Sequence, residues 1–143
     1  HNFLIMEDRK YVDISHITRK QHEPFQNWID IVTVMAFVSN DVIKGLSGAL
    51  IVAGMSNNHW DMTEHAVALA QQNPRNVLGF ITQKRIKEGN CLCFTPGISL
   101  SNTSSNDQKY RPIQNVDTDL FIVGRDIYNH ENYEYKANLY STM

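Results

Sequence analysis

Residues 3–13 read FLIMEDRKYVD, an apolar run followed at once by a dense set of charges. The apolar residues 3–6 are typical of a strand, and alternate side chains of a strand project to the same face. On a strand, Asp8 and Lys10 share a face, while Asp13 lies beyond the strand end and can reach another element or a partner chain. The stretch therefore predicts a strand that carries a candidate cluster of functional charges.

Further apolar runs of strand length follow, at residues 29–34, 50–53, 77–81, 92–94 and 120–123. They are continuous rather than alternating, which favours strands covered on both faces, as in parallel sheets. Helices are predicted at about residues 14–26, 61–72 and 128–140. At the start of the second helix, Asp61 is a candidate N-cap, with Glu64 three residues on as in a capping box.

Strands that alternate with helices indicate repeated βα units, and two architectures fit them: an open doubly wound sheet, or a (β/α)₈ TIM barrel lacking two units. No G-x-G-x-x-G follows the first strand, which argues against a dinucleotide-binding sheet. Polar residues gather just after the strand ends, where barrels carry their active sites. A barrel usually needs about 200 residues, so 143 residues are few for a complete one, and the residues alone leave both architectures open.

Composition excludes several classes of function. The formal charge of −2 argues against a dedicated nucleic-acid partner or an anionic membrane surface. No apolar run approaches the ~20 residues of a membrane span. Two cysteines are too few for a disulfide scaffold, so we expect a reducing compartment, the cytoplasm. The chain starts without a signal-peptide pattern, and its apolar first residues suggest a cut at the edge of a strand.

The charges of the opening stretch suggest one kind of chemistry. An ammonium such as Lys10, held between the carboxylates of Asp8 and Asp13, is suited to stabilise a developing carbanion and then to give it a proton. The alternative for these residues is a solvated charged turn, which is common on protein surfaces.

A second candidate site lies near the last strand. Gly124 ends the strand and Arg125 begins a helix, so backbone N–H groups and a guanidinium fork converge as in a phosphate site. The polar loop 98–114 has the length of a lid, and its Gln108 and Tyr110 could close over a phosphate. A surface arginine and a merely flexible loop are the alternatives. Cys91, Cys93 and the histidines lack the spacing of metal ligands, so we expect no metal.

The opening stretch resembles the D-x-K-x-x-D signature of the orotidine 5′-monophosphate decarboxylase family. It is most similar to the eukaryotic form, the C-terminal domain of uridine monophosphate synthase. Other segments recur in the family's order along nearly the whole chain: Met55-Ser56, Gly79-Phe80-Ile81, Phe94-Thr95-Pro96-Gly97, Asp107-Gln108-Lys109-Tyr110 and Ile122-Val123-Gly124-Arg125. The resemblance implies one truncated (β/α)₈ TIM barrel domain over residues 1–143, with units 3 to 8 present. It also implies a homodimer with shared active sites, and conversion of orotidine 5′-monophosphate to UMP without cofactor or metal.

The resemblance also implies a role for each site residue. Lys10 would donate the proton, Asp8 would face the substrate carboxylate and hold the lysine, and Asp13 would reach the partner's site. The substrate-binding residues would be Ser56 and Pro96 at the pyrimidine, and Gln108, Tyr110, Gly124 and Arg125 at the 5′-phosphate.

Two departures from the family keep other interpretations open. Ile17 stands where the family has a threonine, and the family's first two strands, with an aspartate and a lysine of the site, have no counterpart. We therefore expect the 143 residues alone to be inactive. The alternatives are an inactive remnant that serves as a structural or interaction module, and a sister enzyme on the same barrel that shares D-x-K-x-x-D.

Overall fold

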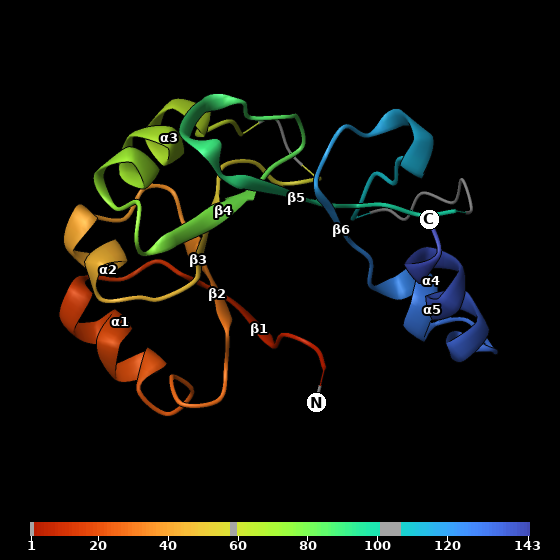
Figure 1. The fold of residues 1–143 in the computed structure, drawn as a ribbon, viewed down its shortest axis with the longest axis horizontal. Helices are drawn as coiled ribbons and strands as arrows, with labels where there is room; N and C mark the ends of the chain where they lie inside the picture. The colour runs from red at the N-terminus through yellow and green to blue at the C-terminus, as the bar shows by residue number, and fades with distance from the viewer. Residues whose placement is uncertain (1, 58–59, 101–106) are drawn as a thin grey trace.

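The computed structural model of the chain describes residues 2–57, 60–100 and 107–143. Its strands form one parallel sheet in which each strand lies beside the next in sequence. The strands are β1 (Met6–Tyr11), β2 (Ile31–Met35), β3 (Ala49–Val52), β4 (Val77–Ile81), β5 (Leu92–Pro96) and β6 (Leu120–Ile122). The sheet curls into part of a barrel (Figure 1), which confirms the predicted truncated (β/α)₈ architecture.

The helices lie outside the curled sheet. They are α1 (Ser15–His22), α2 (Asn40–Lys44), α3 (Thr63–Gln72), α4 (Arg125–Tyr128) and α5 (Tyr133–Ser141), with the single 3₁₀ turns η1 (Glu88–Asn90) and η2 (Ile113–Asn115). In Figure 1, α1, α2 and α3 follow one another along one side of the sheet, whereas α4 and α5 pair at the opposite end. None of the helices in the described part of the chain has the length and apolar character needed to cross a bilayer.

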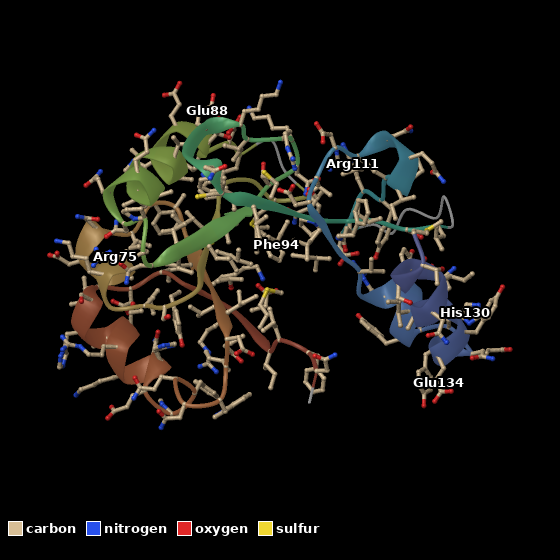
Figure 2. All side chains as sticks on the ribbon, viewed as in Figure 1. Arg75, Glu88, Phe94, Arg111, His130 and Glu134 are labelled. Carbon is tan, nitrogen blue, oxygen red and sulfur yellow. The ribbon has the colours of Figure 1, made fainter. Side chains whose placement is uncertain are left out.

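Two apolar layers cover the two faces of the sheet. The outer layer joins strand residues such as Val32, Val34 and Ile51 to the helix residues Ala66 and Leu69. The inner layer fills the concave face with Ile31, Leu50, Val52, Ile81 and Phe94, and Phe94 lies near the middle of the molecule (Figure 2). Both faces of a strand are thus apolar, which is the physical reason why the strands read as continuous apolar runs.

The first strand lies later in the sequence than predicted. The run at residues 3–6 precedes β1 almost entirely, and the charged segment itself forms the strand. Pairing with β2 sets this register, because Met6 lies opposite Ile31 and Glu7 opposite Val32. Only the start of the strand was predicted too early, because apolar character was taken to mark it, whereas an edge strand tolerates exposed charges. The prediction that Asp8 and Lys10 lie on this strand and Asp13 beyond its end is confirmed.

Three helix predictions also need correction. The helix predicted at residues 14–26 ends at His22, and Pro24, which has no N–H to donate, follows in a turn. The helix predicted from Asp61 begins at Thr63 with no capping box; Asp61 instead accepts hydrogen bonds from the backbone N–H and the hydroxyl of Thr63. The helix predicted at residues 128–140 is two helices, since the Asn132 side chain caps a new one by accepting the Tyr135 N–H.

The close approach of β4 and β5 at Gly79 gives a test of the sheet. A Cβ at this residue would lie 2.1 Å from the carbonyl oxygen of Leu92, which is backbone and cannot turn aside. We expect Gly79→Ala to lower the free energy of unfolding by about 1–3 kcal/mol, as overpacking does, measured by urea denaturation. Gly45→Ala is the matched control, because its nearest neighbour would be at 3.5 Å. Equal unfolding midpoints for the two variants would contradict the pairing described here.

Candidate active site

Parallel strands bring all their carboxyl ends to one edge of the sheet, and the predicted site residues gather there. Lys10 lies near the end of β1, Ser56 follows β3, and Pro96 ends β5. Gln108 and Tyr110 belong to the segment after β5, while Gly124 and Arg125 follow β6. They form two clusters, one on β1 and one that joins the ends of β3, β5 and β6.

The first cluster is a pair of opposite charges fixed by a buried hydroxyl. The Lys10 Nζ lies 2.6 Å from Asp8 Oδ2, and both side chains are partly open to solvent. Thr33, which is fully buried on β2, donates its hydroxyl to Asp8 Oδ1 at 3.0 Å and accepts the backbone N–H of Lys10 at 2.8 Å. One threonine thereby fixes both the Asp8 carboxylate and the backbone of Lys10.

The backbone at Lys10 is unusual. Its φ is +55°, in the left-handed region, and the pairing of β1 with β2 shifts register between Glu7 and Tyr11. A non-glycine residue in this region costs of order 1–3 kcal/mol, and such strain concentrates at functional positions. The irregularity explains why the Lys10 N–H bonds the Thr33 side chain and not the backbone ladder of β2.

Asp13 lies apart from this pair. Its carboxylate accepts the N–H of Ile14 at 2.7 Å, at the start of α1, and its carbonyl accepts the hydroxyl of Thr18. Within the described residues of this chain it makes no ion pair with Lys10. Thr18 is buried and already engaged there, so it does not replace the hydroxyl that Ile17 lacks.

The second cluster surrounds a pocket of about 170 Å³. Its lining includes five of the predicted substrate-binding residues: Pro96, Gln108, Tyr110, Gly124 and Arg125. The sixth, Ser56, joins through Gln108, whose Nε2 donates to Ser56 Oγ at 3.2 Å. The structure therefore brings together all the residues predicted for the phosphate and the pyrimidine, from three different strand ends.

Arg125 is the cation of this pocket. Its Nη2 donates to Gln108 Oε1 at 2.6 Å, and its guanidinium carbon lies 5.8 Å from the centre of the Tyr110 ring. Its Nη1 donates to Asp107 Oδ1 at 3.0 Å, and this hydrogen bond raises the pKa of Arg125. The guanidinium is thus oriented by three neighbours from one short segment.

Other contacts hold that segment and α4 in place. The guanidinium of Arg111 donates to the carbonyl and the side-chain oxygen of Gln83, after β4, at 2.9 and 3.0 Å. Asp126, next to Arg125, accepts the Tyr140 hydroxyl and pairs with Lys136 at 3.4 Å. Burial and then the hydrogen bond to Asp126 raise the pKa of Tyr140 to about 12, so the phenol stays a donor throughout the physiological range.

Sequence reasoning missed Thr33 and the pairing of Asp107 with Arg125. Thr33 sits inside an apolar strand, where a threonine reads as a β-branched core residue. The only sign of its role in the sequence was a single hydroxyl residue between Val32 and Val34. Asp107 was part of a matching segment, but only the fold shows its contact with a residue 18 positions away. Residues 101–106 of the predicted lid loop lie outside the described residues.

A larger hollow of about 690 Å³ lies over the start of α3, beside Asp61 and Lys84. These two residues pair at 2.7 Å, and hydrogen bonds from Lys84 and Thr63 lower the pKa of Asp61 to about 2. The hollow contains none of the predicted site residues. Among the residues that the structure describes, no group of three or more histidine, cysteine or acidic side chains is placed to hold a metal ion.

The fold and the two clusters define a class: a barrel-type α/β protein with a cation–carboxylate pair on one edge strand and an arginine pocket at the other. Comparison with known proteins then gives the family. The model of the orotidine 5′-phosphate decarboxylase / HUMPS family matches residues 1–140. The chain belongs to this family.

Curated relatives carry the same names. The chain is 34% identical to uridine 5′-monophosphate synthase of Bos taurus, over 98% of this chain and 34% of that protein. It is also 34% identical to orotidine 5′-phosphate decarboxylase of Aureobasidium pullulans, over 97% of this chain and 60% of that protein. The chain thus spans between a third and three fifths of the length of these relatives.

Solved structures agree on the fold. Orotidine 5′-monophosphate decarboxylase of Methanocaldococcus jannaschii, complexed with the inhibitor BMP, superposes with a TM-score of 0.71 at 22% identity. The match covers 99% of this chain and 73% of that one. The curled six-stranded sheet is therefore a portion of a decarboxylase-type barrel.

The role of Thr33 in the first cluster can be tested by its removal. Thr33→Val keeps the shape of the side chain but leaves the Lys10 N–H without an acceptor, and an unsatisfied buried donor costs about 1–3 kcal/mol. We expect a loss of that size in the free energy of unfolding, measured in urea. Thr33→Ser retains the hydroxyl and should lose less. A Val variant as stable as the wild type would show that the hydroxyl does not hold the cluster.

Proposed function

We propose that the protein serves in the decarboxylation of orotidine 5′-monophosphate to UMP, in cytoplasmic pyrimidine biosynthesis, without metal or cofactor. The observation that carries this proposal is the Asp8–Lys10 pair, fixed by Thr33 at the carboxyl edge of the sheet. Its support is the family to which the chain belongs. A strained lysine held against a carboxylate is costly for folding and is therefore best explained by chemistry.

The 5′-phosphate would bind in the Arg125 pocket. A guanidinium fork suits a phosphate, and the side chains of Gln108 and Tyr110 and the backbone of Gly124 line the same space. Ser56 and Pro96 would then meet the pyrimidine. Binding energy from this remote group is useful if it is realised where the reaction occurs.

The reaction itself would take place at Lys10. The bond between the pyrimidine carbon and the carboxylate breaks, CO₂ leaves, and the electron pair remains on the ring carbon. The Lys10 ammonium stabilises that negative charge and then transfers a proton to the carbon, which gives UMP. Asp8 holds the lysine and faces the departing carboxylate, whose repulsion is relieved as CO₂ leaves.

Asp13 would act across a homodimer. It lies exposed at the start of α1 and away from the Lys10 amine of its own chain. In the proposed dimer its carboxylate completes the charge array of the partner's site. This assignment explains why the third charge of the motif lies outside the first cluster.

A structural or interaction module is the second candidate. The observation that favours it is the pair of sheet edges, since in the described sheet β1 and β6 each have a neighbouring strand on one side only. Open edges present unpaired backbone groups to another chain. A module of this kind needs no affinity for a nucleotide, so ligand binding separates the two candidates.

The test is titration with UMP by calorimetry, together with assay of decarboxylation. We expect Arg125→Ala to weaken UMP binding by about 1–3 kcal/mol, as loss of a charge-assisted hydrogen bond does, and to leave uridine binding unchanged. Lys10→Ala should retain UMP binding and abolish turnover in the longest form of the protein that contains this sequence.

Arg75→Ala is the matched control, because it removes a guanidinium just before β4, on the far side of the molecule from α4 and α5 (Figure 2). It should change neither binding nor turnover. Absence of UMP binding to the unmodified protein would favour the interaction module, and turnover retained by Lys10→Ala would refute the role of the lysine.

A further inference from the structure

Beside the pocket proposed for the phosphate, Arg125 pairs with a negative charge that the proposed function does not use. Asp107 places Oδ1 at 3.0 Å from Nη1 of Arg125, the nitrogen that a phosphate would also seek. The other terminal nitrogen, Nη2, donates to Gln108. Both terminal nitrogens of the guanidinium are therefore engaged by residues of its own chain.

The two partners of Arg125 differ in how they respond to an anion. Gln108 is neutral and anchored, since its amide also donates to Ser56. Asp107 carries a charge, and its side chain is 69% exposed. A rotation of the Asp107 side chain into water would free Nη1 while Gln108 and the rest of the pocket stay in place.

The backbone on the C-terminal side of Asp107 is held against the end of β5. Arg111 donates its N–H to the carbonyl of Gly97 at 2.9 Å, and a Cβ on Gly97 would lie 3.1 Å from the carbonyl oxygen of Lys109. This packing keeps the segment against the end of β5. Asp107 therefore remains within reach of Arg125 and competes at high local concentration.

We propose that Asp107 is an internal competitor of phosphate for the Arg125 guanidinium. The inference rests on the proposed function, in that it takes Arg125 to be the phosphate ligand. A phosphomonoester binds by exchanging the Asp107 carboxylate for its own oxygens, and the carboxylate returns when the ligand leaves. Asp107 thus lowers the affinity of the site for phosphate-bearing ligands and favours release of the product.

The experiment compares Asp107→Asn with the unmodified chain, with inorganic phosphate, UMP and uridine as probes in calorimetry. An exposed ion pair contributes up to about 1 kcal/mol, so removal of the competitor should tighten phosphate and UMP binding by about two- to fivefold. Uridine, which has no phosphate, should bind equally to both proteins. Unchanged or weaker phosphate binding by Asp107→Asn overturns the proposal, as does absence of phosphate binding to both proteins.

Two further variants separate competition from general charge. Asp117→Asn makes the same change in net charge at an exposed residue that faces Arg85, and it should leave phosphate affinity unchanged. In an Arg125→Ala background, Asp107→Asn should no longer increase phosphate affinity, because the contested group is absent. An equal increase in that background would mean plain repulsion and would overturn the proposal.

The same titrations distinguish this inference from the proposed function. Tighter phosphate binding by Asp107→Asn with no UMP binding or turnover would leave the competition standing and refute the nucleotide function. UMP binding and turnover with no effect of Asp107→Asn would support the nucleotide function and refute the competition by Asp107.

Discussion

Parallel pairing of each strand with its neighbour in sequence is the constraint on which the rest of this structure depends. Such pairing needs a crossover between neighbouring strands, and α1, α2 and α3 lie on one face of the sheet while an inner apolar layer fills the other. The pairing also brings all the carboxyl ends to one edge. Residues as far apart in sequence as Ser56, Gln108 and Arg125 form one hydrogen-bonded chain there for this reason.

The fold was predictable to the extent that burial controls it. Continuous apolar runs marked β2, β3, β4 and β5 because both faces of these strands carry buried residues. The run at β6 is also apolar, but β6 is an edge strand and its Leu120 and Phe121 are exposed. The start of β1 was predicted too early, since an edge strand with charges is held by its register with Ile31 and Val32 and not by its own apolar residues. Helix ends depended on side-chain contacts at Asp61 and Asn132 that sequence spacing did not specify.

The candidate site was predictable as residue types and only partly as geometry. The matching segments pointed to Asp8, Lys10 and Arg125, and the structure brings Gln108, Tyr110 and Arg125 together in one pocket. The motif could not show that Thr33 contacts both Asp8 and Lys10, or that Asp107 contacts Arg125. Such contacts join different strands, and their distances depend on the register and the curl of the whole sheet.

The two clusters also differ in how they balance charge. In the first, Lys10 faces Asp8 and a buried hydroxyl fixes the geometry, so the pair is preorganised. In the second, Arg125 is neutralised by a residue that is open to water. A preorganised ion pair suits a side chain that must be in place when a reaction occurs. An ion pair that water can reach suits a side chain that exchanges its partner for a ligand.

The left-handed backbone of Lys10 has a consequence for the evolutionary history of the chain. Glycine adopts this conformation freely and asparagine does so with little cost. A lineage released from catalysis would gain stability by drifting to one of them, because selection would then act on folding alone. On the proposed role of Lys10, the amino acid found at this position in close orthologues is therefore a natural record of whether selection for that role has persisted.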